Sequence, residues 1–351
     1  MGRCQPGYYQ EVQPNLVNAT SRFAERFPEQ SAAGFYRQIH GFTVSSIGIG
    51  TYLGEMDDAT DRGYQEAVSA ALASGVNFID TSLNYRNQRS ERSIGVALRR
   101  VQRDEVAICT KAGYLVPDAV PTGVLKAEDV VGGMHSMAPG FLADQVGRSR
   151  QNLGVESIDV FYLHNPETQL AYIGETDFLA RIRRAFEYLE QAVARGEIRF
   201  YGTATWQGYR HRTPSREALS LESIERVATE IAGEGHHFRF IQLPFNLAMP
   251  EAFVQRVNGE SVLEVAARLG IAVVASASLY QARLSRNLPD EIRAKLAGSE
   301  TDAQRAIQFV RSTPGISVAL VGMSSVAHVN ENLGLARIPP LNPEQYFSLY
   351  Q

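Results

Sequence analysis

The sequence alternates short, almost continuous apolar runs with longer segments in which apolar residues recur at helical spacing. Eight apolar runs follow this pattern, at residues 47–52, 76–81, 106–111, 158–164, 200–205, 240–243, 272–276 and 318–322. Runs that are apolar on both faces are typical of strands that are covered on both sides, as in a parallel sheet. The pattern therefore predicts eight buried parallel strands.

Segments of helical period separate these runs, at residues 64–74, 90–100, 141–153, 182–195, 221–232, 262–269 and 302–312. Four of them are followed by a glycine, which commonly ends a helix in a left-handed conformation, and these are Gly75, Gly154, Gly196 and Gly270. Eight strands with intervening helices favour one closed (β/α)8 TIM barrel, with a doubly wound open sheet as the alternative.

The segment before the first long strand has a different pattern. Residues 1–33 are polar and aperiodic, so we expect an irregular N-terminal extension there. Residues 35–39 and 42–44 flank Gly41 and predict a short β-hairpin. The barrel then forms a single domain over residues 34–351. Two long connections, 112–140 and 280–301, follow strands, and such loops lie over the active face of a barrel.

Composition and net charge limit the kinds of binding partner that we expect for this protein. Of the 351 residues, 44% are hydrophobic, and the formal net charge is −4, so we expect no nucleic-acid partner. The two cysteines, Cys4 and Cys109, allow neither a disulfide framework nor a zinc site. No apolar run approaches the ~20 residues of a membrane span, and the first residues lack the apolar stretch of a signal peptide. We expect a cytoplasmic protein with no membrane partner, and the sequence leaves its oligomeric state open.

Ionisable residues end three successive predicted strands. Lys111 and His164 each close an apolar run, Asp80 is the next-to-last residue of another, and Tyr85 lies in the loop after Asp80. Because the carboxyl ends of parallel strands meet at one mouth of a barrel, we expect these four side chains to lie together. An ammonium group lowers the pKa of a nearby phenol, a carboxylate keeps the lysine charged, and a neutral imidazole donates a hydrogen bond to a carbonyl oxygen. The set fits carbonyl reduction better than hydrolysis, which would need paired carboxylates or a metal.

The same segments resemble those of the aldo-keto reductase family. The similar segments are residues 75–85 with Ser90-Glu91 and 94–98 around the family's catalytic aspartate and tyrosine, Thr110-Lys111, residues 159–164 with Asn165-Pro166, and residues 196–202. The resemblance runs from about Gly34 to Ala336. It implies hydride transfer from a reduced nicotinamide to a small aldehyde or ketone, or from the alcohol in reverse. Tyr85 would then be the proton donor, Lys111 its pKa partner, Asp80 the anchor of the lysine and His164 the residue that orients the carbonyl.

The resemblance also implies positions that contact the cofactor: Thr205, Gln242, Ser278, Leu279, Arg283, Gly322, Ser324, His328 and Asn332. Three residues depart from the family pattern. Ala204 precedes Thr205 where the family commonly has Ser-Asn, Ser276 stands where a tyrosine often stacks on the nicotinamide, and Ser325 replaces a basic residue that holds the 2′-phosphate. A dianionic phosphate is bound best by charged groups. The sequence therefore favours NADP(H) only slightly over NAD(H).

Other interpretations remain open. The altered cofactor positions allow a nucleotide-binding sensor or regulatory barrel with little turnover. Residues 48–54 resemble a dinucleotide-binding glycine motif, but the third glycine is one place late. His236-His237 could suggest a metal pair, yet no third ligand is evident, and we expect no metal site. His135 and Trp206 fall in loops over the predicted mouth and are as compatible with a structural role as with a substrate pocket.

Overall fold

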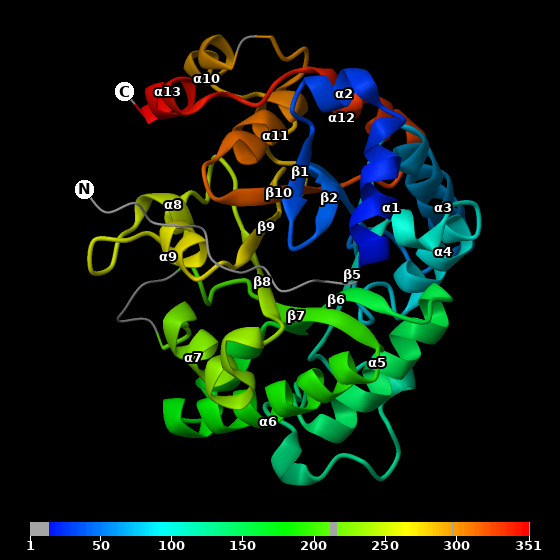
Figure 1. Ribbon diagram of the computed structural model, residues 1–351, viewed down its shortest axis with the longest axis vertical. Helices are drawn as coiled ribbons and strands as arrows, with labels where there is room; N and C mark the ends of the chain where they lie inside the picture. Colours follow the sequence, from blue (N-terminus) through cyan, green and yellow to red (C-terminus); the bar gives the residue numbers. More distant parts are fainter. Residues whose placement is uncertain (1–13, 211–215, 297, 351) are drawn as a thin grey trace.

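The computed structural model describes residues 14–210, 216–296 and 298–350. Eight parallel strands close into a barrel in the order β10-β3-β4-β5-β6-β7-β8-β9 (Figure 1). Their bounds are β3 Ile47–Gly50, β4 Phe78–Asp80, β5 Ala107–Ala112, β6 Ile158–His164, β7 Ile198–Ala204, β8 Phe238–Pro244, β9 Ala272–Ser276 and β10 Ile316–Gly322. Because β10 pairs with β3, the sheet has no open edge. The predicted TIM barrel is confirmed, and the open sheet is excluded.

Helices connect successive strands and cover the outside of the barrel. The longer ones are α3 Asp58–Ala73, α4 Arg89–Leu98, α5 Pro139–Leu153, α6 Glu175–Ala194, α7 Leu221–Ala232, α9 Val262–Arg268, α11 Asp302–Ser312 and α12 Val326–Leu333. Short helices add α8 Glu251–Val254, α10 Asp290–Lys295 and α13 Pro343–Phe347. Gly154 ends α5 with a φ of 68°, as the sequence pattern predicted. No helix in the described part of the chain is both long and apolar enough to cross a membrane.

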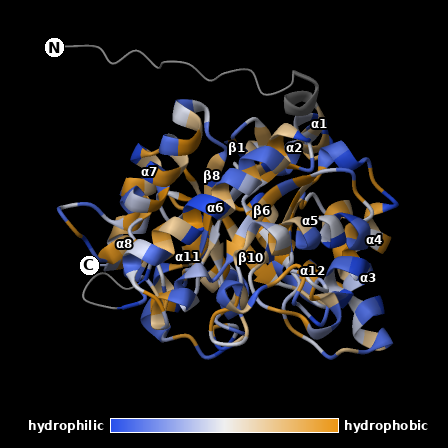
Figure 2. Ribbon diagram, turned by 90° about the horizontal axis from the view of Figure 1, so that it is seen from below, coloured by the Kyte–Doolittle hydropathy of each residue, from blue (hydrophilic) through white to orange (hydrophobic). Residues whose placement is uncertain are grey.

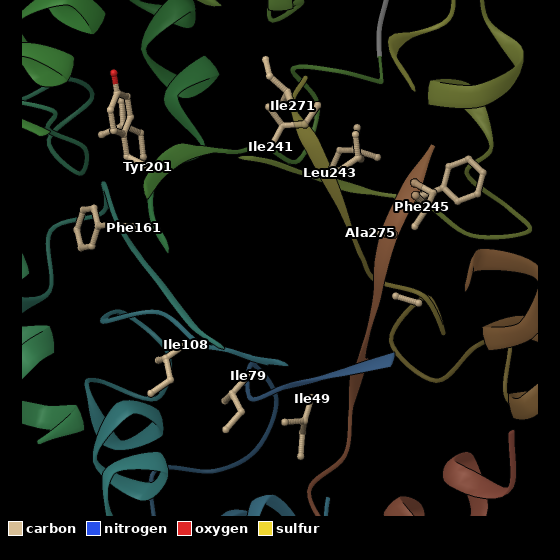
Figure 3. Packing of buried hydrophobic residues seen from close by; sticks show 14 of the residues in the cluster. Ile49, Ile79, Ile108, Phe161, Tyr201, Ile241, Leu243, Phe245, Ile271 and Ala275 are labelled. Carbon is tan, nitrogen blue, oxygen red and sulfur yellow. The ribbon is translucent and has the colours of Figure 1, made fainter. Parts of the chain in front are cut away.

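Two apolar layers hold the barrel together. Side chains that point outward from the strands pack under the helices, and Figure 3 shows Ile49, Ile79, Ile108 and Phe161 in this layer. Alternate residues of the same strands fill the interior, among them Phe78, Cys109, Tyr162, Phe240 and Val274. Figure 2 shows the hydrophobic residues gathered on the strands and the hydrophilic ones on the outer faces of the helices. Burial on both faces explains the nearly continuous apolar runs in the sequence.

A β-hairpin closes the N-terminal end of the barrel. Its strands are β1 Tyr36–Ile39 and β2 Phe42–Ser45, paired antiparallel, and Ile39 and Phe42 join the interior apolar cluster. The turn residues His40 and Gly41 have φ of 44° and 84°. The ring of His40 lies 5.3 Å from that of Phe240 at the bottom of β8. The predicted hairpin is confirmed, and it leaves the C-terminal ends of the strands as the open face.

The N-terminal extension differs from the irregular segment expected over residues 1–33. Helix α1 covers Pro14–Glu25 and helix α2 covers Pro28–Ala32, while residues 1–13 lie outside the described residues. Ala19 and Phe23, one helical turn apart, are buried, and the Thr43 backbone N–H donates to the Thr20 hydroxyl at 2.9 Å. Ala24 is buried as well, and Leu16, Ala19 and Phe23 recur at helical spacing, so a short amphipathic pattern was overlooked among the polar residues. Contact with β2 stabilises the helix.

Candidate active site

Strand register places the predicted residues at one level of the barrel. Asp80, Lys111, His164 and Gln242 follow the interior residues Phe78, Cys109, Tyr162 and Phe240 by two positions, so they also point inward. They occupy the last three positions of their strands: Asp80 and His164 end β4 and β6, Lys111 is next to last in β5, and Gln242 is third from the end of β8. Parallel strands in register therefore bring four polar side chains to the C-terminal mouth, directly above the apolar interior.

A buried ion pair lies at the centre of this cluster. The Lys111 ammonium is 2.6 Å from Asp80 Oδ1, and the two side chains are 1% and 4% exposed. Lys111 also donates to the Thr81 carbonyl oxygen at 2.6 Å. The Gln242 amide donates to the second carboxylate oxygen, Asp80 Oδ2, at 2.8 Å. Both oxygens of Asp80 are thus engaged, which fixes its carboxylate and the lysine that it holds.

Tyr85 reaches the cluster from the loop after β4. The Lys111 ammonium nitrogen lies 4.9 Å from the centre of the partly buried Tyr85 ring, on the ring face. The next three residues, Arg86, Asn87 and Gln88, all have left-handed φ angles of 49°, 49° and 69°. Such backbone is unfavourable for residues other than glycine and persists only where the surroundings enforce it. Here the buried Arg86 guanidinium donates to the Glu55 carbonyl at 2.7 Å and to Asp61 at 2.6 Å.

The electrostatics of the pair correct one expectation for Tyr85. Burial lowers the pKa of Lys111, but Asp80 and Tyr85 raise it more, so the ammonium stays charged. The sequence predicted that Lys111 would lower the pKa of the phenol. Burial instead raises the pKa of Tyr85 above its usual 10.0, and the opposing effect of Lys111 does not cancel it. Tyr85 is therefore protonated at neutral pH.

His164 lies beside Tyr85 and is held in its neutral form. Its ring centroid is 5.8 Å from that of Tyr85 and 5.3 Å from that of Tyr114. Burial, with the charge of Lys111 and the nearby His135, lowers the pKa of His164 well below 6.5. The neutral imidazole agrees with the role expected from the sequence. The Nδ1 atom lies 3.2 Å from the Ser82 hydroxyl, so Nε2 is the ring nitrogen left for another partner.

Two of the predicted cofactor residues adjoin the cluster. Gln242 and Thr205 are both 4% exposed, and the Thr205 backbone N–H donates to the Gln242 carbonyl at 2.8 Å across β7 and β8. The expectation for Gln242 was a contact with the cofactor carboxamide. In the structure its amide nitrogen binds Asp80, and the residue belongs to the hydrogen-bond network of the ion pair.

The remaining predicted cofactor residues lie after β9 and β10. Ser278 is buried and Leu279 packs against the core, while the exposed Arg283 guanidinium lies 4.9 Å from the centre of the Tyr280 ring. Gly322, Ser324 and His328 are exposed, and Asn332 is buried on α12. Within residues 14–210, 216–296 and 298–350, the buried atoms Ser278 Oγ and Asn332 Oδ1 have no hydrogen-bond partner.

The start of α12 suits a phosphate group. Ser325 caps this helix, accepting from the His328 backbone N–H, and the exposed Gly322 and Ser324 precede it. A Cβ atom built on Gly322 would meet no atom within 4 Å. Helix N-termini bind anions through free backbone N–H groups and the helix dipole. Together with the orphaned Ser278 and Asn332 oxygens, this segment fits a dinucleotide that reaches from the barrel mouth to α12.

Sequence reasoning did not find several residues that touch the cluster. Ser82 contacts His164, Thr81 accepts from Lys111, and the Tyr52 and Tyr85 ring centroids are 5.0 Å apart. Tyr114 lies edge-on against His164. Each follows the end of an observed strand by one or two residues, and this position is the signal that could have marked them.

The histidine pair His236-His237 and the glycine motif at residues 48–54 have structural explanations. His237 Nδ1 lies 2.7 Å from Glu190 and His236 Nε2 lies 3.3 Å from Glu225, so each histidine pairs with its own acid. The described residues contain no group of three or more His, Cys, Asp or Glu side chains that could hold a metal ion. Gly48 belongs to β3, where a Cβ atom would come within 2.9 Å of Leu320. Close packing in the barrel, not nucleotide binding, explains that glycine.

Fold and site together define the class: a (β/α)8 barrel with Asp, Tyr, Lys and His gathered at its C-terminal mouth. A family model described as the aldo/keto reductase family matches residues 46–350. The chain belongs to the aldo/keto reductase family.

Individual relatives are distant. D-threo-aldose 1-dehydrogenase of a Pseudomonas species is 26% identical over 183 residues, which is 50% of this chain and 52% of that protein. The chain thus matches about half the length of this relative. A probable voltage-gated potassium channel subunit beta of Arabidopsis thaliana is 21% identical over 86% of this chain and 90% of that protein.

Solved structures share the fold. An aldo/keto reductase of Klebsiella pneumoniae, in complex with NADP and acetate, is 24% identical with a TM-score of 0.63, over 88% of this chain and 91% of that one. The holo form of an aldo-keto reductase of Bacillus halodurans is 20% identical with a TM-score of 0.65, over 90% and 95%.

Proposed function

We propose that this protein is an NAD(P)H-dependent oxidoreductase that interconverts a small carbonyl compound and its alcohol, with Tyr85 as the general acid. The observation that carries the proposal is the buried Lys111–Asp80 pair, at 2.6 Å, with its ammonium 4.9 Å from the centre of the Tyr85 ring. A neutral His164, whose ring lies 5.8 Å from that of Tyr85, completes the set.

The protonation states of Tyr85, Lys111 and His164 suit the transfer of a proton from Tyr85 to the carbonyl oxygen of the substrate. Because burial raises the pKa of Tyr85, the phenol carries its proton when a carbonyl compound arrives. As that proton moves to the forming alkoxide, negative charge grows on the phenolic oxygen next to the fixed Lys111 ammonium. An interaction that strengthens as the charge develops lowers the barrier more than it stabilises the resting state. Asp80 keeps Lys111 charged and in place. When the Ser82 hydroxyl donates to Nδ1 of the neutral His164 ring, Nε2 carries the ring proton and donates to the carbonyl oxygen.

The cofactor is a nicotinamide dinucleotide, which supplies the hydride when bound. Thr205 and Gln242 would hold the nicotinamide end, Ser278, Leu279 and Arg283 the pyrophosphate, and Gly322, Ser324, His328 and Asn332 the adenosine end. NADP(H) is the preferred form, in line with the family and with the Klebsiella structure in complex with NADP. The Pseudomonas relative is named an aldose dehydrogenase, so aldoses belong in the substrate screen beside simple aldehydes.

A cofactor-binding sensor with little turnover is the second candidate. Ala204, Ser276 and Ser325 replace residues that usually contact the cofactor in this family. The Arabidopsis relative, which aligns over most of both chains, is named as a channel subunit and not as an enzyme. A sensor would bind NADPH and leave every carbonyl compound unreduced.

The Tyr85→Phe substitution separates these functions. NADPH oxidation is measured with a panel of aliphatic and aromatic aldehydes and aldoses, and NADPH and NADH affinities are measured by fluorescence titration. We expect Tyr85→Phe to lower turnover at least about a hundredfold, because general acid catalysis contributes 10²–10⁴-fold, while the affinity for NADPH stays the same. Tyr172→Phe, at an exposed tyrosine, is the matched control. Near-normal turnover by Tyr85→Phe would refute the assignment of the acid.

A further inference from the structure

His135 lies in the long loop between β5 and α5 and contacts the backbone of His164. Its Nε2 atom is 2.8 Å from the His164 carbonyl oxygen, and its side chain is fully buried. A carbonyl oxygen only accepts hydrogen bonds, so Nε2 carries the proton and donates. The other ring nitrogen, Nδ1, lies 3.1 Å from the Gln169 amide nitrogen, which donates to it. Both nitrogens of the neutral ring are therefore satisfied, and the ring has one defined tautomer.

The space around this contact is tight. A Cβ atom built on Gly113 would lie 2.4 Å from the His164 carbonyl oxygen and 2.6 Å from His135 Nε2. Only glycine at position 113 therefore lets the imidazole reach that carbonyl. The same ring lies edge-on to Tyr114, with centroids 5.4 Å apart, and Tyr114 lies edge-on to His164 at 5.3 Å. His135 thus touches His164 directly through the backbone and indirectly through one aromatic ring.

The backbone of His135 is also fixed within its loop. The Val131 N–H donates to the His135 carbonyl oxygen at 2.8 Å, and the Ser136 N–H donates to the Gly113 carbonyl at 2.8 Å. Residues 113–136 therefore form a closed loop whose two ends meet beside His164. Any displacement of this loop therefore moves the His135 Nε2–H group, which donates to the His164 carbonyl oxygen.

We propose that His135 is a positioning residue: its Nε2–H bond to the His164 carbonyl sets where the His164 imidazole stands relative to Tyr85. The inference rests on the proposed function, because it concerns the residue that orients the carbonyl. Sub-ångström placement of such a group matters, since misplacement by about 1 Å can cost 10²-fold in rate. The role needs a donor at the Nε2 position and does not need a charge, because burial lowers the pKa of His135 to about 4.

Two isosteric substitutions test the role. Glutamine places its amide nitrogen near the position of His135 Nε2, whereas asparagine places its nitrogen near Nδ1 and falls short of the His164 carbonyl. We expect His135→Asn to lower kcat about tenfold with the KM for the carbonyl compound and the Kd for NADPH unchanged, and His135→Gln to stay within about threefold of the wild type. Gln169→Met, which removes only the donor to Nδ1, should lower kcat in the same direction by less, and it carries the test if His135→Asn does not fold.

A second readout is independent of turnover. The ring-nitrogen chemical shifts of His164 in 15N-labelled protein report its tautomer and environment. We expect them to change in His135→Asn and to return toward the wild type in His135→Gln. Equal losses of kcat in the Gln and Asn variants, or unchanged His164 shifts in His135→Asn, would overturn the proposal. A wild type that turns over no carbonyl compound would refute the proposed function, while the His164 shifts would still decide the positioning role.

Discussion

Replacing Asp80 by asparagine should leave a buried charge without its partner. In the wild type the Lys111 and Asp80 side chains are 1% and 4% exposed and lie 2.6 Å apart. Asparagine keeps an acceptor for the Gln242 amide, but Lys111 retains only the Thr81 carbonyl oxygen as an acceptor. Breaking one side of a buried ion pair costs about 3–5 kcal/mol, because the remaining charge stays desolvated. We expect Asp80→Asn to lower the free energy of unfolding by this amount at pH 7.5.

A double variant tests whether the unpaired Lys111 charge causes the loss of stability in Asp80→Asn. Asp80→Asn/Lys111→Met removes the charge together with its partner, and it should recover most of the lost free energy. The single variant should also regain stability as the pH rises toward 10. Without Asp80, burial lowers the pKa of Lys111 in the folded protein below the ~10.4 of the unfolded chain, so the folded state benefits as the lysine loses its proton.

Urea unfolding followed by circular dichroism, at pH 7.5 and pH 9.5, measures these differences for the wild type and both variants. The reasoning fails if Asp80→Asn is within 1 kcal/mol of the wild type, or if the double variant is less stable than the single one. Either result would mean that solvent reaches Lys111 and that the lysine does not depend on the carboxylate.

Two further predictions concern residues around the site. His135 has its pKa lowered from 6.5 to about 4, so its contribution to stability is complete above pH 6.5 and is lost as the pH falls to 4. The wild type should therefore lose about 3 kcal/mol more than His135→Gln over that range in urea unfolding, and parallel curves would contradict the assignment. Arg86→Lys keeps the charge but loses the guanidinium bond to the Glu55 carbonyl, which helps to enforce the left-handed turn after Tyr85. We expect it to lower kcat with little change in NADPH affinity, and an unchanged kcat would show that the turn holds without Arg86.

The barrel could be predicted because each strand carries its own signal. Residues 158–164 and 272–276 were predicted with the bounds that β6 and β9 have, since strands buried on both faces give continuous apolar runs. Asp80, Lys111 and His164 were found for a related reason. Each occupies the end of such a run, and parallel strands must bring their ends together.

The features that the sequence did not reveal depend on contacts between distant segments. The contact between His135 and His164 spans 29 positions and requires a loop to fold back past Gly113. The raised pKa of Tyr85 depends on how deeply the mouth buries the phenol, which no motif encodes. Helix α1 was not predicted because its few apolar residues, among them Ala19 and Phe23, stand in a largely polar segment, and the helix is stabilised by its contact with β2.

The hairpin and α1 make the two ends of the barrel different, because they cover only the N-terminal end. The hairpin strands β1 and β2, held by the contact between Thr20 and Thr43, cover the end of the barrel opposite Tyr85. Substrate therefore reaches Tyr85 from the C-terminal mouth, and the covered end can be modified without blocking that access. A tether attached through the exposed face of α1 would hold the molecule by its back, with the mouth directed into the solution. Immobilisation from that side should leave turnover intact, whereas a tether near Met56, on the loop after β3, would obstruct it.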